Sequence, residues 1–483
     1  MTPSLFIILA MTLYAISYWT ENLWFLVFLI FVALAAAIEK LIPKKTLTVF
    51  WHGALTGICF LLVGLPPLLI IEQVHYGDTN KLFITFIFKI LLFFAVASLV
   101  YGGIIGTIFI AFQKLRKKMP LFPAYLICLP LLWVLAEIVL RKITFGFDWW
   151  LMGIPLISSS LFRPLVILGG VPALSFFAAA ASTSLWLLIP SLKERRIWPI
   201  VFSLLLPLAG ISYGFTYTAL NNEENGMGLP STAIVQPNIE FPKIFPIEKD
   251  AAYGPLIHRA LELKAGIIIL PAQIKSPLTK EEEINGQFWK NILGDALAKS
   301  SATIILYLPI KYPDEKIHQT MFALKQGKVA GEYKKEGLFP VSDYLPRGFY
   351  RILFSDPPGY AIDPYLPIGP EDKNGLIEKS WLIGGVICNE PFSPNIRERM
   401  KRIGAKTLIV SGSDRPFLLR LIFMGTLRMA RLRAFESRIW IFRAYKSGIS
   451  AVITPAGEIM QKLNKDERGI IYFDSQKSFT EKF

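Results

Sequence analysis

The chain has 483 residues, of which 53% are hydrophobic and 18% charged, which is too apolar for an ordinary soluble protein and too long for one domain. Its formal net charge of +15 would suit a nucleic-acid-binding protein, but many basic residues stand in short loops between apolar runs, which is a membrane-topology pattern. The three cysteines provide no disulfide framework and the four histidines no metal-ligand spacing, so we expect no cofactor and no nucleic-acid partner.

The first 220 residues predict a bundle of about seven membrane spans. Most of the apolar runs reach the roughly 20 residues that a bilayer core requires, while the first run is short and the fourth is long enough to tilt. The first run lacks a basic leader and a small-residue cleavage site, so we interpret it as a retained helix. The expected spans are Leu5–Trp19, Leu23–Ile38, Val49–Ile71, Leu82–Phe112, Leu121–Leu140, Leu161–Ile189 and Trp198–Ala219.

Loop charges orient these spans. Basic residues follow the even-numbered spans, at Lys40–Lys45, Lys114–Lys118 and Lys193–Arg196, whereas the opposite loops carry mixed charges. Because cytoplasmic loops are enriched in lysine and arginine, the amino terminus is predicted to be cytoplasmic. An odd number of spans then places everything after Ala219 outside the cytoplasm.

The composition changes after a polar, glycine-containing segment at residues 221–230. We therefore predict a transmembrane domain over residues 1–220, a linker over 221–230, a second domain over 231–475 and a polar tail over 476–483. Strands alternate with helices in the second domain, which is typical of a layered α/β fold. The expected strands include Thr232–Gln236, Gly266–Leu270, Ala302–Ile310, Leu382–Ile387, Lys406–Ser411, Trp440–Tyr445, Gly448–Thr454 and Gly469–Phe473; the expected helices are Ala251–Lys264, Glu281–Lys299 and Phe417–Ser437.

The strand Leu382–Ile387 ends in Cys388, Asn389 and Glu390. Strand ends are where a scaffold presents reactive side chains. Cys388 is the only cysteine outside the apolar half, and a lone cysteine beside an acid indicates a nucleophile. Free cysteines are also among the most buried structural residues, so the strand end alone leaves both interpretations open.

A second segment, Glu332–Pro346, follows a hairpin-like stretch whose turn we place at Gly327. The pattern Y-x-K-x-x-L-x-P-x-x-E-Y-x-P is matched here by Tyr333, Lys335, Leu338, Pro340, Tyr344 and Pro346, with Asp343 in place of the glutamate. The pattern I-C-x-E followed by F-x-P is matched by Ile387, Cys388, Glu390, Phe392 and Pro394. With a multi-spanning half before them, these motifs resemble the apolipoprotein N-acyltransferases, the membrane branch of the nitrilase (carbon–nitrogen hydrolase) superfamily. The resemblance covers nearly the whole chain.

The resemblance implies an αββα nitrilase-like sandwich outside the membrane and a bacterial inner-membrane location. It implies a cysteine nucleophile at Cys388 and a lysine at Lys335 that stabilises the oxyanion, with Asp343 and Glu390 matching two further acidic positions. The implied partners are membrane lipid, with a phospholipid as acyl donor, and diacylglyceryl apolipoproteins as acceptors. The resemblance also suggests apolar arms at the membrane surface, at Glu240–Pro246 and within Leu345–Pro367.

One expected residue is missing. The family's general-base glutamate should follow the strand Gly266–Leu270, but Ala272 stands at its position, and a methyl group accepts no proton. Three readings remain: an acyltransferase in which Lys335 lowers the thiol pKa while Asp343 or Glu390 relays the proton, an inactive lipid- or lipoprotein-binding relative, and a membrane-tethered amidase. Loss of a general base slows a reaction about 10²–10⁴-fold, so slow chemistry is compatible with this sequence.

Overall fold

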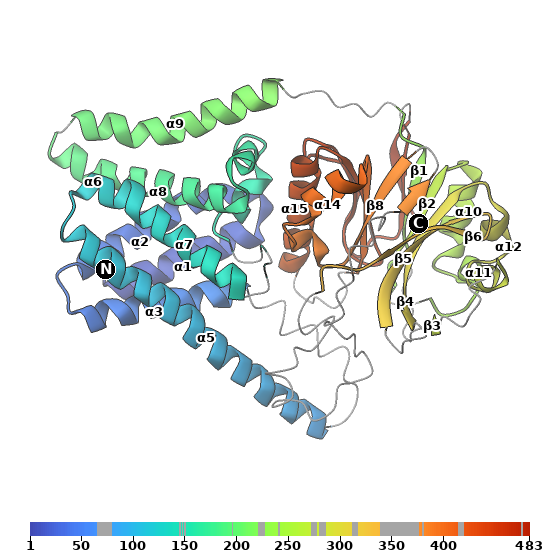
Figure 1. The fold of residues 1–483 in the computed structure, drawn as a ribbon, viewed down its shortest axis with the longest axis horizontal. Coiled ribbons are helices and arrows are strands. Elements are labelled where there is room, and N and C mark those ends of the chain that lie inside the picture. Colours follow the sequence, from blue (N-terminus) through green and yellow to red (C-terminus); the bar gives the residue numbers. More distant parts are fainter. Residues whose placement is uncertain are drawn as a thin grey trace. The chain divides into compact units, whose positions relative to one another are not determined.

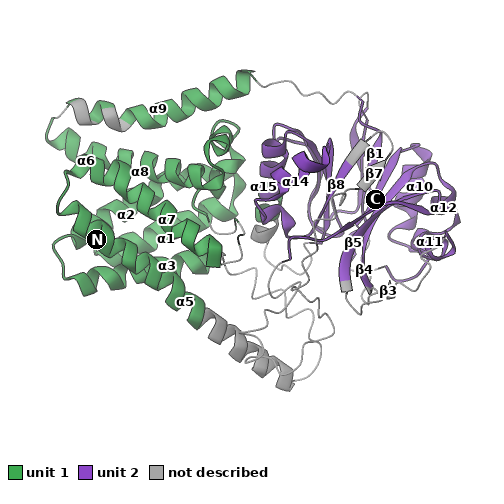
Figure 2. Ribbon diagram, viewed as in Figure 1, with its two compact units in different colours: residues 1–222, 419–428 green, residues 223–418, 429–483 purple. Residues whose placement is uncertain are grey.

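The computed structural model describes residues 1–64, 80–143, 146, 148, 151–195, 197–220, 228–239, 242–271, 278–279, 286–311, 317–338, 376–378, 381–413, 420–474 and 477–483. The chain divides into two compact units, shown in Figure 2. Unit 1 comprises Met1–Asn222 and Leu419–Arg428, and unit 2 comprises the rest. The boundary after Asn222 falls near the start of the expected linker, whereas Leu419–Arg428 groups with unit 1 although the sequence assigned it to the second domain.

Unit 1 is helical (Figure 1). Five helical stretches among the described residues are long and apolar enough to cross a membrane, and α1 and part of α9 are shorter apolar helices. Each of the seven expected spans overlaps a helix, but the structure supports a count of five, and seven stays a prediction. The helices are α1 (Pro3–Trp19), α2 (Val27–Leu41), α3 (Thr46–Gly64), α5 (Asn80–Arg116), α6 (Leu121–Pro123), a π-helical turn (Ala124–Cys128), α7 (Leu129–Ile143), α8 (Val171–Lys193) and α9 (Ile197–Leu220).

The outer surface of unit 1 carries large apolar side chains. Leu99 on α5 is 76% exposed and Phe215 on α9 is 71% exposed. In water such apolar surfaces would be costly, whereas lipid tails surround them without penalty. The helices also satisfy their own backbone hydrogen bonds, which the interior of a bilayer requires. The exposed apolar side chains therefore support the assignment of unit 1 to a membrane.

The sixth expected span begins too early. The sequence predicts a helix from Leu161, but the structure has a 3₁₀ turn at Arg163–Leu168 and starts α8 only at Val171. Gly170 adopts a left-handed φ of 71°, and Pro172 occupies the first turn of α8 without needing an amide partner. The glycine and the proline set the start of the helix.

The segment Leu419–Arg428 contributes a buried cation to unit 1. The guanidinium of Arg428 donates to the Tyr18 carbonyl oxygen at 2.7 Å and to the Ser158 hydroxyl at 2.8 Å. Arg428 lies in α15 (Arg420–Ser437), so this helix begins in unit 1 and its remaining residues belong to unit 2.

Unit 2 contains two sheets. The strand order in the eight-stranded sheet is β14-β13-β1-β2-β4-β5-β6, with β3 paired to β4; in the six-stranded sheet it is β12-β11-β10-β9-β8-β7. The pairs β1–β2, β2–β4, β3–β4, β8–β9 and β9–β10 are parallel, and the other pairs are antiparallel. The strands are β1 (Thr232–Gln236), β2 (Ile267–Leu270), β3 (Leu278–Thr279), β4 (Thr303–Lys311), β5 (Ile317–Lys325), β6 (Lys328–Lys334), β7 (Leu376–Glu378), β8 (Trp381–Ile387), β9 (Thr407–Gly412), β10 (Trp440–Tyr445), β11 (Ser450–Ile453), β12 (Ile459–Leu463), β13 (Gly469–Phe473) and β14 (Phe479–Lys482).

The two sheets pack face to face, with helices on their outer faces. One core lies between the sheets, where Ile269 and Ile305 from the first meet Ile409 and Phe442 from the second. The alternate residues of the first sheet face a second core beneath α10 (Gly254–Glu262), α11 (Gly286–Leu293) and α12 (Asp295–Lys299). On the outer side of the second sheet lie α14 (Ile396–Ile403) and the later part of α15 (Figure 1). Unit 2 is therefore the expected αββα sandwich.

Two details differ from the prediction. The expected helix Glu281–Lys299 is broken at Gly294, whose φ is 103° and where a Cβ would lie only 1.9 Å from the Glu248 side chain. The Glu248 carboxylate caps α12 by accepting from the Asp295 amide at 3.0 Å. Residues Phe479–Lys482, which the sequence assigned to a polar tail, form β14 and pair with β13.

Candidate functional site

The β5–β6 hairpin positions Lys335. Gln326 and Gly327 have φ values of 50° and 68°, which is the geometry of a tight two-residue hairpin turn, and the prediction of a turn at Gly327 is confirmed. Lys335 follows β6 directly, and its amide donates to the Gln319 carbonyl oxygen at 2.9 Å, so the ladder holds it in register. The side chain is buried, with an exposed fraction of 2%.

Cys388 follows β8 in a left-handed backbone conformation, with φ of 58°. Such a conformation costs about 1–3 kcal/mol in a residue other than glycine, and it persists only where surrounding contacts impose it. Here the Cys388 amide donates to the Ser411 carbonyl oxygen at 2.8 Å, and the Tyr445 hydroxyl donates to the Cys388 carbonyl oxygen at 3.3 Å. Gly412 leaves room for the turn, since a Cβ there would lie 3.2 Å from the Cys388 Cα.

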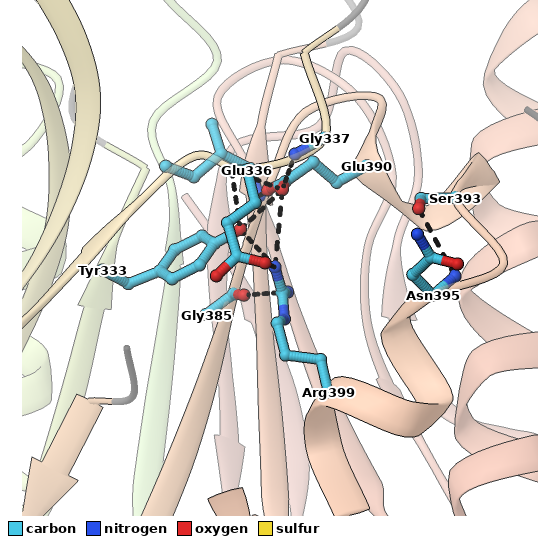
Figure 3. A network of polar contacts seen from close by, with 9 residues as sticks. Tyr333, Glu336, Gly337, Gly385, Glu390, Ser393, Asn395 and Arg399 are labelled. Atoms are coloured by element: carbon cyan, nitrogen blue, oxygen red, sulfur yellow. Dashed lines mark hydrogen bonds and ion pairs between the residues drawn. The ribbon is translucent and has the colours of Figure 1, made fainter. Parts of the chain in front are cut away.

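Glu390 joins the cysteine segment to the lysine segment, as Figure 3 shows. Its Oε2 accepts from the Ile387 amide at 2.6 Å, next to Cys388. Its Oε1 accepts from the Gly337 amide at 2.8 Å, the Glu336 amide at 3.1 Å and the Tyr333 hydroxyl at 2.5 Å. The carboxylate is 1% exposed. One buried side chain therefore fixes the backbone on both sides of the site.

Arg399 on α14 completes this network. Its Nη1 donates to the Tyr333 hydroxyl at 2.5 Å, and its Nη2 donates to the Gly385 carbonyl oxygen at 2.7 Å. The same Nη1 lies 3.3 Å from Glu336 Oε2 and 3.6 Å from Glu390 Oε1. The guanidinium also covers the Tyr333 ring, 4.6 Å from its centroid.

Burial raises the pKa of the Tyr333 phenol well above its ordinary value, against the opposing charge of Arg399. The phenol therefore keeps its proton near neutral pH, and it serves as a donor to the Glu390 carboxylate while accepting from Arg399.

Sequence reasoning did not single out Arg399. The helix reads Ile-Arg-Glu-Arg-Met-Lys-Arg and looks like a solvated charged surface. The spacing of the apolar residues could have indicated that Arg399 is buried. Arg399 stands three residues after Ile396 and one before Met400, on the buried face of the helix.

The five predicted site residues are described unequally. Lys335, Cys388 and Glu390 lie in segments that the structure brings together through Glu390. Ala272 and Asp343 lie outside the described residues. Within the described ranges, no group of three or more histidine, cysteine, aspartate or glutamate side chains is placed to hold a metal ion.

The comparisons with known proteins agree with this architecture. Residues 233–482, about half of the chain, match the carbon–nitrogen hydrolase family, so the chain belongs to that family. Residues 10–184 match the apolipoprotein N-acyltransferase N-terminal domain. The two matches in one chain place it in the membrane branch, the apolipoprotein N-acyltransferases.

Individual relatives extend across both units. An apolipoprotein N-acyltransferase of Pseudomonas putida is 26% identical over 472 residues, covering 93% of this chain and 86% of the relative. One from Aquifex aeolicus is 27% identical over 480 residues, covering 96% and 97%. Among solved structures, Saccharomyces cerevisiae Nit3, a member of branch 10 of the nitrilase superfamily, aligns with 50% of this chain and 89% of its own, at 19% identity and a TM-score of 0.37.

Proposed function

We propose that this protein is an inner-membrane N-acyltransferase that moves an acyl chain from a phospholipid, through a thioester on Cys388, to the N-terminal amine of diacylglyceryl-cysteine lipoproteins. The observation that carries the proposal is the union of apolar helices with a carbon–nitrogen hydrolase domain in one chain, in the same order as in relatives named apolipoprotein N-acyltransferase.

The chemistry has two steps. The Cys388 thiolate attacks the ester carbonyl of the phospholipid, the C–O bond breaks, and the lysophospholipid leaves with a proton. The acceptor amine then attacks the thioester, the C–S bond breaks, and the amine's proton returns to the thiol. In both steps Lys335 stabilises the oxyanion of the tetrahedral intermediate.

The contacts of Glu390 help to choose between Asp343 and Glu390 as the residue that relays the proton. The two oxygens of Glu390 together accept three amide hydrogen bonds and one phenol hydrogen bond, so both oxygens already hold the backbone and the Tyr333 side chain in place. We assign Glu390 a positioning role and keep Asp343 as the candidate acid–base group, since Ala272 cannot take a proton.

The described part of the expected arm Glu240–Pro246, residues 242–246, supports access to lipid. Ile244 and Phe245 are 50% and 47% exposed, although both are large and apolar. The base of the segment is fixed, because the Lys243 amide donates to the buried Asp250 carboxylate at 2.7 Å. Apolar side chains held outward on an anchored loop suit insertion at a membrane surface. The loop charges separately favour a cytoplasmic amino terminus and an extracytoplasmic unit 2.

The second candidate is a relative that binds lipid or lipoprotein without turnover, and Ala272 at the expected general-base position is the observation that favours it. A phospholipid with a labelled acyl chain distinguishes the two. The acyltransferase should acquire a hydroxylamine-sensitive label on Cys388, which Cys388→Ser abolishes and Cys59→Ser preserves. A purified, folded protein that never acquires the label would contradict the enzyme reading.

A further inference from the structure

The cluster around Arg399 contains two carboxylates. Glu390 is 1% exposed and Arg399 is 6% exposed, while the Glu336 side chain is 31% exposed. Both carboxylates approach the same guanidinium nitrogen, Nη1. A buried carboxylate that loses its cation is strongly destabilised, because its charge is left uncompensated away from water. Arg399 therefore offsets negative charge on both of the segments that form the site.

Lys335 is the neighbour of Glu336 and is itself buried. The proposed role of Lys335 is to stabilise negative charge on the Cys388 thiolate and on the oxyanion. Nearby carboxylates oppose this role, because their negative charge disfavours further negative charge beside them. The charge of Arg399 counters those carboxylates without belonging to the reacting atoms.

The guanidinium also fixes positions. It reaches β6 through Tyr333 and β8 through the Gly385 carbonyl oxygen. Gly385 leaves room for the Tyr333 ring beside β8, because a Cβ there would lie 2.7 Å from Tyr333 Cδ1. Arginine suits this place because its planar fork supplies several donors in fixed directions, which an ammonium group does not.

We propose that Arg399 is a positioning residue of this active site: by compensating Glu390 and Glu336 it keeps the charge of Lys335 available to Cys388. The inference rests on the proposed roles of Cys388 and Lys335. It predicts that loss of the Arg399 charge lowers the reactivity of Cys388, and that loss of a neighbouring carboxylate restores part of it.

The test measures how fast iodoacetamide alkylates Cys388 near neutral pH in detergent, with the modified residue located by mass spectrometry. Arg399→Gln should slow alkylation about tenfold or more, which corresponds to a rise of one unit in the thiol pKa. Arg397→Gln is the matched control, because Arg397 is exposed on the same helix and the substitution removes the same charge. It should change the rate by less than about twofold.

Two further variants separate charge compensation from a merely structural role. Arg399→Lys keeps the charge but not the planar fork of donors, so it should react at least about threefold faster than Arg399→Gln. Adding Glu336→Gln to Arg399→Gln should recover at least about threefold of the lost rate, since one opposing carboxylate is gone. Equal rates for Arg399→Gln and Arg397→Gln, or a double variant no faster than Arg399→Gln, would overturn the proposal.

Folding of the variants is checked by thermal melting. If Arg399→Gln does not fold, Arg399→Lys is compared with Arg399→Lys carrying Glu336→Gln: a faster double variant supports the proposal, and an equal or slower one overturns it. Alkylation of Cys388 needs no acyl donor, so it can be measured even if the protein transfers no acyl group. A wild-type protein that is alkylated but never acquires an acyl label would refute the proposed function. The alkylation rates of the variants would still decide the role of Arg399.

Discussion

Tyr333 and Glu390 meet across the two segments of the site, with the phenol donating to Oε1 at 2.5 Å. Tyr333 belongs to β6 in one sheet, and Glu390 follows β8 in the other. Because the Glu390 carboxylate also holds amides on both sides, this hydrogen bond connects the turn after β8 to the segment that carries Lys335.

Tyr333→Phe should therefore destabilise unit 2 without changing its packing volume. Hydrogen bonds to charged groups contribute about 1.5–3 kcal/mol, and the loss should appear as a lower thermal midpoint in detergent. Tyr472→Phe is the control, since that hydroxyl makes only a long bond of 3.4 Å to the Leu263 carbonyl oxygen. If both variants have the same thermal midpoint, the hydrogen bond between Tyr333 and Glu390 does not stabilise unit 2.

Gly385→Ala should crowd the interface between the sheets. The added methyl group would lie 2.7 Å from Tyr333 Cδ1, and the ring is buried, so something must shift at a cost of about 1–3 kcal/mol. Gly286→Ala at the exposed start of α11 meets nothing nearer than 3.7 Å and should be neutral or slightly stabilising. Chemical unfolding of both variants measures the difference; equal stability would show that the sheets adjust freely at Gly385.

Membrane topology is tested by two matched lysines in a background without native cysteines. Lys299→Cys, exposed at the end of α12, should react with a membrane-impermeant maleimide in intact spheroplasts. Lys117→Cys, exposed in the loop after α5, should react only after lysis. The reverse pattern would contradict the charge-based orientation.

Ala272→Glu should raise the rate of acyl transfer if the missing carboxylate limits the reaction. The expected gain is about 10²–10⁴-fold for a correctly placed general base, and it should vanish in a variant that also carries Cys388→Ser. A slower Ala272→Glu enzyme would mean that the site works with another base, for which Asp343 is the candidate.

The sequence predicted what local patterns determine. An apolar run ending at Cys388 and a glycine turn before Lys335 were enough to expect a strand end and a hairpin, and both are present. The predicted start of α8 at Leu161 was wrong. The apolar pattern continues through residues 161–170, but Gly170 and Pro172 set the start of the helix at Val171. The break at Gly294 was missed because the helical pattern continues across it.

The side-chain contacts of the site could not be predicted from local sequence patterns. Glu390 was identified as an acidic position, but its role depends on amides after β6, more than fifty residues earlier and in the other sheet. Arg399 stands in a strongly charged helix, and only the packing of α14 on β8 shows that its guanidinium is buried. Such long-range pairings follow from the fold as a whole, which is why motif spacing alone did not reveal them.

The most direct test of the acyltransferase account follows the acyl group after it reaches Cys388. Protein labelled with an acyl chain is separated from lipid and mixed with a diacylglyceryl-cysteine peptide whose terminal amine is free. The account predicts that label leaves Cys388 and appears on the peptide as a hydroxylamine-resistant amide, and that an N-acetylated peptide accepts none. Release of the label as free fatty acid at the same rate with or without the peptide would identify an amidase-like hydrolase and contradict the account.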